Sequence, residues 1–93
     1  MGKIIRSDSW SSADDQTLTN IVLTHIKEGL TRLDGFEQAG DQLSRTSAAC
    51  AFRWNTVLKP SKQTEIKEAN RQRLARIREL KGRSRALNEK VNI

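Results

Sequence analysis

Residues 43–55 read LSRTSAACAFRWN, and this stretch decides the fold of the 93-residue chain. It begins with a short polar break in which the hydroxyl groups of Thr46 and Ser47 can cap a helix. Pro60 disfavours helical backbone at the residue before it. We therefore predict a helix that runs from about Ser47 to Leu58 and stops before the proline.

The predicted helix has two different faces. At about 100° per residue, Cys50, Val57 and Leu58 fall on the same side as Trp54, and this apolar side is expected to face inward. The opposite face carries small, aromatic and hydrogen-bonding side chains, namely Ala48, Ala49, Phe52, Asn55, Thr56 and Lys59. Such a face suits the major groove of DNA, where Asn can bond adenine twice and Phe can contact the methyl group of thymine.

The surroundings of this helix favour contact with phosphate. No acidic residue lies between Asp41 and Glu65. Arg45, Thr46 and Ser47 at the helix start are candidate phosphate contacts through their side chains and through free backbone N–H groups.

Two further patterns predict two helices before this stretch. Ser11, Ser12 and Thr31 are each followed three residues later by an acidic residue, which is the spacing of a helix cap. Gly29 is a natural end for the first of these helices. The three helices are expected to close one core, formed by Trp10, Leu18, Val22, Ile26, Leu33, Phe36, Leu43, Cys50 and Trp54.

Residues 61–93 differ in composition from the rest of the chain. They contain ten Lys and Arg against four Asp and Glu, which accounts for the whole net charge of +6, whereas residues 1–60 are neutral. We expect a long basic helix. It contains an imperfect heptad pattern, which Gly82 interrupts and whose positions are Ile66, Arg73, Leu80 and Leu87. Two alternatives stay open: a homodimer through residues 62–91, and a solvated helix that frays beyond Gly82. In either case the basic residues predict added affinity for phosphate.

Several classes of protein do not fit the sequence. Cys50 is the single cysteine, so an intramolecular disulfide is excluded. No segment has the apolar core of a signal peptide or the roughly 20 apolar residues of a membrane span. We expect a cytoplasmic, nucleoid-associated protein. Because the sequence offers no nucleophile–base pair, phosphate-binding glycine loop or metal-ligand set, we expect no enzyme activity, cofactor, metal or small-molecule substrate.

Two segments resemble the Myb/SANT-like repeat of helix-turn-helix proteins. Residues 10–15, WSSADD, are similar to the opening of that repeat, and residues 45–54, RTSAACAFRW, are similar to its third helix. The sequence resembles more closely the RsfA-like prespore regulators of spore-forming Bacillus-type bacteria, above all in residues 43–55. This likeness covers about residues 6–58. Phe36 stands where the repeat has its middle tryptophan, a change that preserves volume.

The resemblance implies an all-α fold in which a three-helix, Myb-like helix-turn-helix bundle precedes the long basic, coiled-coil-like helix. We divide the chain into an arm (residues 1–7), the Myb-like domain (8–60) and the basic C-terminal helix (61–93). The resemblance also implies a DNA-binding regulator of transcription that reads double-stranded DNA through Ala51, Phe52, Asn55 and Thr56. The whole predicted interface consists of Arg45, Thr46, Ser47, Ala48, Ala51, Phe52, Arg53, Asn55, Thr56, Lys59 and Lys62.

Two alternatives accompany this prediction. Arg53 is expected either to contact phosphate or to form a structural ion pair with Asp14 or Asp15. The domain as a whole has the alternative of a SANT-type protein-interaction module, in which Phe52, Asn55 and the basic helix engage a protein partner such as the transcription machinery or a phage or host factor.

Overall fold

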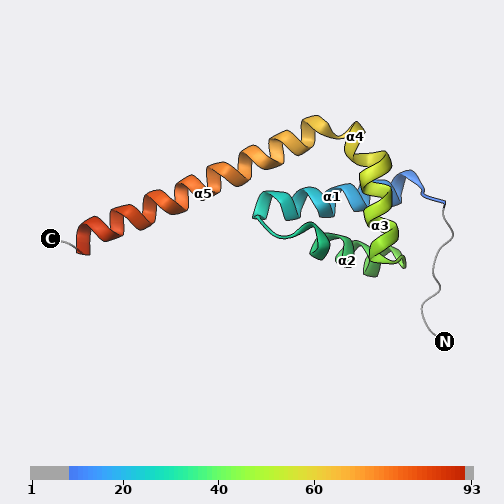
Figure 1. Cartoon of the computed structure of the whole chain (residues 1–93), viewed down its shortest axis with the longest axis horizontal. Helices are drawn as coiled ribbons and strands as arrows, with labels where there is room; N and C mark the ends of the chain where they lie inside the picture. The colour runs from blue at the N-terminus through green and yellow to red at the C-terminus, as the bar shows by residue number, and fades with distance from the viewer. Residues whose placement is uncertain (1–8, 92–93) are drawn as a thin grey trace.

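The computed structural model describes residues 9–91, and the side chains of residues 9–82. Within these residues the regular structure is entirely helical: α1 (Ser12–Glu28), α2 (Arg32–Leu43), α3 (Ser47–Arg53), the π-helix η1 (Trp54–Leu58), α4 (Lys59–Ser61) and α5 (Gln63–Val91). α1 and α2 lie side by side, α3 and η1 cross them near one end, and α5 packs on α1 before it extends beyond the bundle (Figure 1). The expected all-α class is confirmed for this part of the chain.

Each of the first three helices begins at a hydroxyl cap. Ser11 accepts a hydrogen bond from the backbone N–H of Asp14, and the Asp14 carboxylate accepts one in return from the backbone N–H of Ser11. Thr31 and Thr46 each accept a hydrogen bond from the backbone N–H three residues later, at 3.1 and 3.0 Å. Gly29 ends α1 with a left-handed φ of 72°. These local signals are the ones that the sequence predicted.

The core forms where α1, α2 and α3 meet. Seven of the nine predicted core residues are buried: Leu18, Val22, Ile26, Phe36, Leu43, Cys50 and Trp54. Trp10 is half-buried at the edge of the core. The prediction for Leu33 is wrong, because its side chain is 60% exposed. α2 turns Gly35 toward His25 of α1, so a residue two positions away lies on the opposite side of the helix.

The turn between α2 and α3 brings two backbones close together. Ser44 takes a left-handed φ of 55°, and the N–H of Arg45 donates to the carbonyl of Gly40 at 3.0 Å. A Cβ atom on Gly40 would lie only 2.6 Å from the carbonyl oxygen of Arg45. The absence of a side chain at Gly40 therefore allows the helix-turn-helix angle.

The helical backbone does not stop before Pro60, so that prediction is wrong. Lys59 keeps helical angles, φ −53° and ψ −47°, and its N–H donates to the carbonyl of Trp54, five residues earlier. The helical backbone thus continues up to Pro60 through a π turn. Pro60 itself lies in the first turn of α4, where its missing N–H is not needed. The chain leaves the helix at Lys62, with φ −114°.

The start of α5 belongs to the same core as the first three helices. Ile66 is 8% exposed and Ala69 is fully buried, and both join the cluster that contains Trp54. The core therefore continues past residue 60, the boundary drawn from the sequence. Ile66, the first residue of the predicted heptad, is buried in the core of its own chain. Farther along α5 the Leu80 side chain is 57% exposed, and Leu87 lies outside the residues whose side chains are described.

Candidate nucleic-acid interface

The helical stretch from Ser47 to Leu58 presents one face to the core and the other to solvent. Trp54 is fully buried, whereas Phe52 is 71% exposed and Asn55 and Thr56 are exposed as well. Ala48 is also exposed on this stretch. The described part of α5 does not cover these side chains. The orientation predicted from the position of Trp54 is confirmed.

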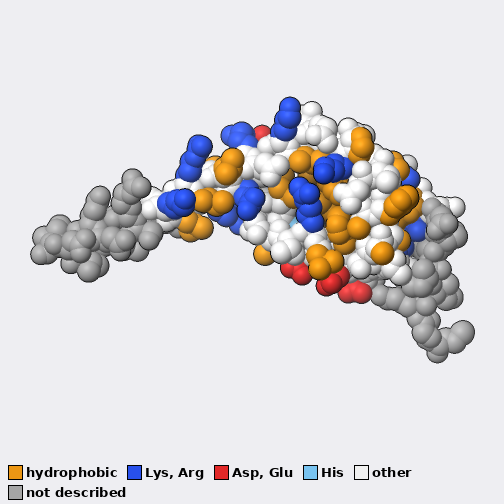
Figure 2. Space-filling model, viewed as in Figure 1, with side chains coloured by type: hydrophobic (Ala, Val, Ile, Leu, Met, Phe, Trp, Pro, Cys, Tyr) orange, Lys and Arg blue, Asp and Glu red, His pale blue; other side chains and the backbone are white. Residues whose placement is uncertain are grey.

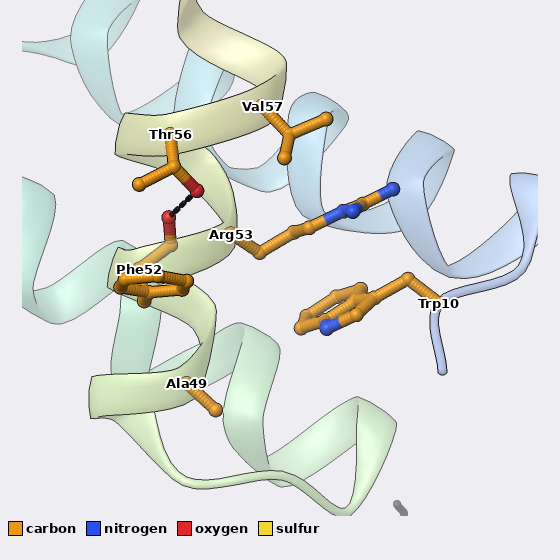
Figure 3. Close-up of a pocket in the computed structure, with 6 residues that line it drawn as sticks. All are labelled: Trp10, Ala49, Phe52, Arg53, Thr56 and Val57. Atoms are coloured by element: carbon orange, nitrogen blue, oxygen red, sulfur yellow. Dashed lines mark hydrogen bonds between the residues drawn. The ribbon is translucent and has the colours of Figure 1, made fainter. Parts of the chain in front are cut away.

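An apolar recess lies along one edge of this exposed face, between the helix and the segment before α1. Its walls are formed by Trp10, Ala49, Phe52, Arg53, Thr56 and Val57, and its volume is about 370 Å³. In Figure 3 the rings of Phe52 and Trp10 lie on opposite sides of the recess, with Ala49 at one end and Val57 at the other. We call this feature the Phe52–Trp10 recess. Trp10 was predicted as a core residue, with stacking on a ligand as the alternative. Val57, predicted to face inward, is 42% exposed.

Arg53 forms a structural ion pair. Its guanidinium donates two hydrogen bonds to the carboxylate of Asp15, at 2.9 and 2.8 Å, and the two side chains are 25% and 23% exposed. The hydrogen bond to Asp15 raises the pKa of Arg53 above its ordinary value. The pair fastens α3 to the first turn of α1, as one of the two alternatives from the sequence predicted.

Arg45 is buried inside the domain. Its guanidinium bonds the carboxylate of Asp14 at 3.1 Å and the backbone carbonyl of Ser9, and it stacks on the ring of Trp10 at 3.9 Å from the centroid. Only 3% of the side chain is exposed. The predicted phosphate contact through this side chain is therefore wrong. Its physical role is to hold the segment before α1 against the start of α3.

The remaining predicted residues lie in different environments. Thr46 is exposed and Ser47 is half-buried at the start of α3. Ala51, one of the base-reading positions implied by the family resemblance, is partly buried and packs against the core. Lys59 is half-buried, and Lys62 lines a separate recess against α1 together with Ser12, Asp15, Gln16, Thr19, Val57, Leu58 and Ser61. Lys62 is thus set apart from the group around Phe52.

Positive charge extends along α5. Figure 2 shows Lys and Arg side chains gathered over this helix, whereas most of the Asp and Glu side chains in the same view lie along its lower edge, over α2. Part of the charge on α5 is paired: Arg71 donates two hydrogen bonds to Glu68, which lowers the pKa of Glu68 to about 2. Both side chains are largely exposed, so solvent screens this pair.

The described residues bear on three further properties: metal binding, membrane insertion and the reactivity of the cysteine. No group of three or more His, Cys, Asp and Glu in this part of the chain could hold a metal ion. None of the helices described is both long enough and apolar enough to cross a membrane. Cys50 is buried, and burial raises the pKa of its thiol, with a smaller opposing effect of Arg45.

A three-helix bundle with a tight second turn and an outward-facing third helix defines a helix-turn-helix domain. Residues 10–74 match the family of Myb-like DNA-binding domains, and the chain belongs to this family. It is 46% identical over 70 residues to the sporulation-specific transcriptional regulator GerR of Bacillus subtilis (strain 168), and the resemblance to the RsfA-like regulators is thereby confirmed. The match covers 75% of this chain and 36% of that relative, so the chain spans about a third of the relative's length. No solved structure matches the chain.

Proposed function

We propose that the chain is a sequence-specific regulator of transcription that places α3 and η1 in the major groove of double-stranded DNA. The observation that carries the proposal is the opposite orientation of two neighbouring aromatic residues, Trp54 fully buried and Phe52 71% exposed. That orientation turns Asn55 and Thr56 outward beside Phe52, where they can reach the edges of bases. Membership in the Myb-like family supports DNA as the ligand.

The proposed contacts divide by chemistry. Asn55 is the proposed reader of adenine, because its amide can donate one hydrogen bond to that base and accept another. Thr46, Ser47, Ala48 and Lys59 are proposed to position the backbone of the duplex. Lys62 and the basic residues of α5 are proposed to add affinity that does not depend on sequence. The name of the similar regulator supports a role in sporulation, which we extend to this chain as part of the proposal.

The test begins with selection of bound duplexes from a random pool, followed by affinity measurements on a selected and on a scrambled duplex. Asn55→Ala should weaken binding to the selected duplex by about 1–3 kcal/mol, because it removes one paired base contact, and should spare the scrambled duplex. Gln38→Ala is the matched control, since it removes an exposed amide from α2, away from the proposed interface.

The outcomes separate the alternatives. Absence of duplex binding even at low salt would exclude the DNA proposal and favour the SANT-type protein-interaction module. Equal affinity for all duplexes would remove base reading from the proposal and leave only phosphate binding. Equal weakening of both duplexes by Asn55→Ala would assign Asn55 to a phosphate or to folding.

A further inference from the structure

Two of the polar groups that line the Phe52–Trp10 recess already have partners within the chain. The hydroxyl of Thr56 donates to the backbone carbonyl of Phe52 at 2.6 Å, shown by the dashed line in Figure 3. The guanidinium of Arg53 is bonded twice to Asp15, through Nε and Nη2. Trp10, Ala49 and Val57 contribute apolar surface. The lining is therefore largely apolar, with the indole N–H of Trp10 on one side, and it favours an apolar ligand group.

The position of the recess indicates which apolar group it meets. Phe52 and Thr56 belong both to the recess and to the face that we propose for the major groove. The one apolar group that bases display in the major groove is the 5-methyl group of thymine. A largely apolar recess that is continuous with the reading face suits contact with that group.

We propose that the Phe52–Trp10 recess binds the 5-methyl group of one thymine, so that this side of the helix reads thymine while Asn55 on the other side reads adenine. The inference rests on the proposed function, because it requires the helix to lie in the major groove. It assigns specificity to Phe52, Thr56 and Ala49, and it gives Trp10 a second role at the edge of the interface.

The test uses the full chain and a selected duplex in which single thymines are replaced by deoxyuridine. This exchange removes only the methyl group and keeps the base pair. At one position we expect about a fourfold loss of affinity, the equivalent of burying one methyl group. Thymines outside the contacted segment serve as controls and should tolerate the exchange.

A variant then connects the methyl group to the recess. In Phe52→Ala the duplexes with thymine and with deoxyuridine should bind equally well at that position. Because Phe52 is 71% exposed, this variant should stay folded, and circular dichroism will verify it. Leu33→Ala removes another exposed apolar side chain, on α2, and should keep the fourfold preference.

If the chain selects a DNA sequence but no position prefers thymine over deoxyuridine, the inference about the recess fails while the proposed function stands. It also fails if the preference persists in Phe52→Ala, since the methyl group would then be read elsewhere. If the chain binds no duplex, both proposals fail, and an apolar side chain of a protein partner becomes the occupant to test.

Discussion

Two arginines that lie eight positions apart in the sequence have different physical roles. Arg45 is buried against Asp14, whereas Arg53 pairs with Asp15 at the surface, with both side chains about a quarter exposed. We expect Arg45→Ala to lower the free energy of unfolding by about 3–5 kcal/mol, because it takes a buried charge away from Asp14. Arg53→Ala should cost less, about 1–2 kcal/mol, since its bidentate pair with Asp15 still has a quarter of each side chain in contact with water.

Urea denaturation of the two variants measures this difference directly. Equal losses would mean that burial does not distinguish the two pairs. If Arg45→Ala stayed as stable as the parent chain and lost DNA affinity instead, Arg45 would return to the set of phosphate contacts.

The same two residues show which side-chain partners could be predicted from the sequence. For Arg53, the alternatives from the sequence included the observed partner, Asp15. Arg45 was assigned to phosphate from its place at the start of the third helix, whereas its burial depends on how the segment before α1 packs against that start. Trp54 was predictable because its inward orientation follows from the helical spacing of Cys50 and Leu58 alone.

At the scale of elements, the turn between α2 and α3 depends on a glycine. Alanine in a helix is ordinarily better than glycine by about 1 kcal/mol. At Gly40 we expect the reverse, a loss of about 1–3 kcal/mol for Gly40→Ala, because the new Cβ would lie 2.6 Å from the backbone oxygen of Arg45. Gly82→Ala is the matched control in α5, where a Cβ would meet nothing within 4 Å.

Thermal and urea unfolding of the two glycine variants provide the measurement. Gly82→Ala should be neutral or stabilising. A Gly40→Ala variant as stable as the parent chain would show that the turn relaxes at no cost, and that this close approach does not fix the helix-turn-helix angle.

The elements were predictable where their signals are local. The caps at Ser11, Thr31 and Thr46 each involve residues only three positions apart, so the sequence contains the whole interaction. The end of the third helix was not predictable from Pro60, because the helical backbone continues to Lys59 through a π turn, a geometry that no local pattern in the sequence indicates. The exposed face of this helix could be predicted. The Phe52–Trp10 recess could not, since one wall comes from a residue before α1.

At the scale of the whole molecule, α5 connects the bundle to the basic end of the chain. Ending the chain at residue 60 removes Ile66 and Ala69 from the core, and we expect a loss of about 2–4 kcal/mol. A chain that ends at residue 74 keeps both residues and should keep the stability of the parent. Cys50 offers a probe besides denaturation, because its thiol is buried and burial raises its pKa. A thiol reagent should modify Cys50 faster in the chain that ends at residue 60 than in the chain that ends at residue 74. Equal rates in both would place the start of α5 outside the cooperative core.

The last prediction concerns the charge that lies beyond the core. Residues 75–93 contain six Lys and Arg against two Glu, and they are absent from a chain that ends at residue 74. If these side chains neutralise phosphates, the slope of log affinity against log salt concentration should fall by about 0.9 for each phosphate that the shorter chain no longer neutralises. We expect the chain ending at residue 74 to bind a selected duplex more weakly and with a shallower slope, while its preference over a scrambled duplex is kept. Light scattering at the same concentrations distinguishes this effect from the loss of a dimer, which would change the mass as well. Identical slopes for the two chains would show that the distal basic residues stay away from DNA.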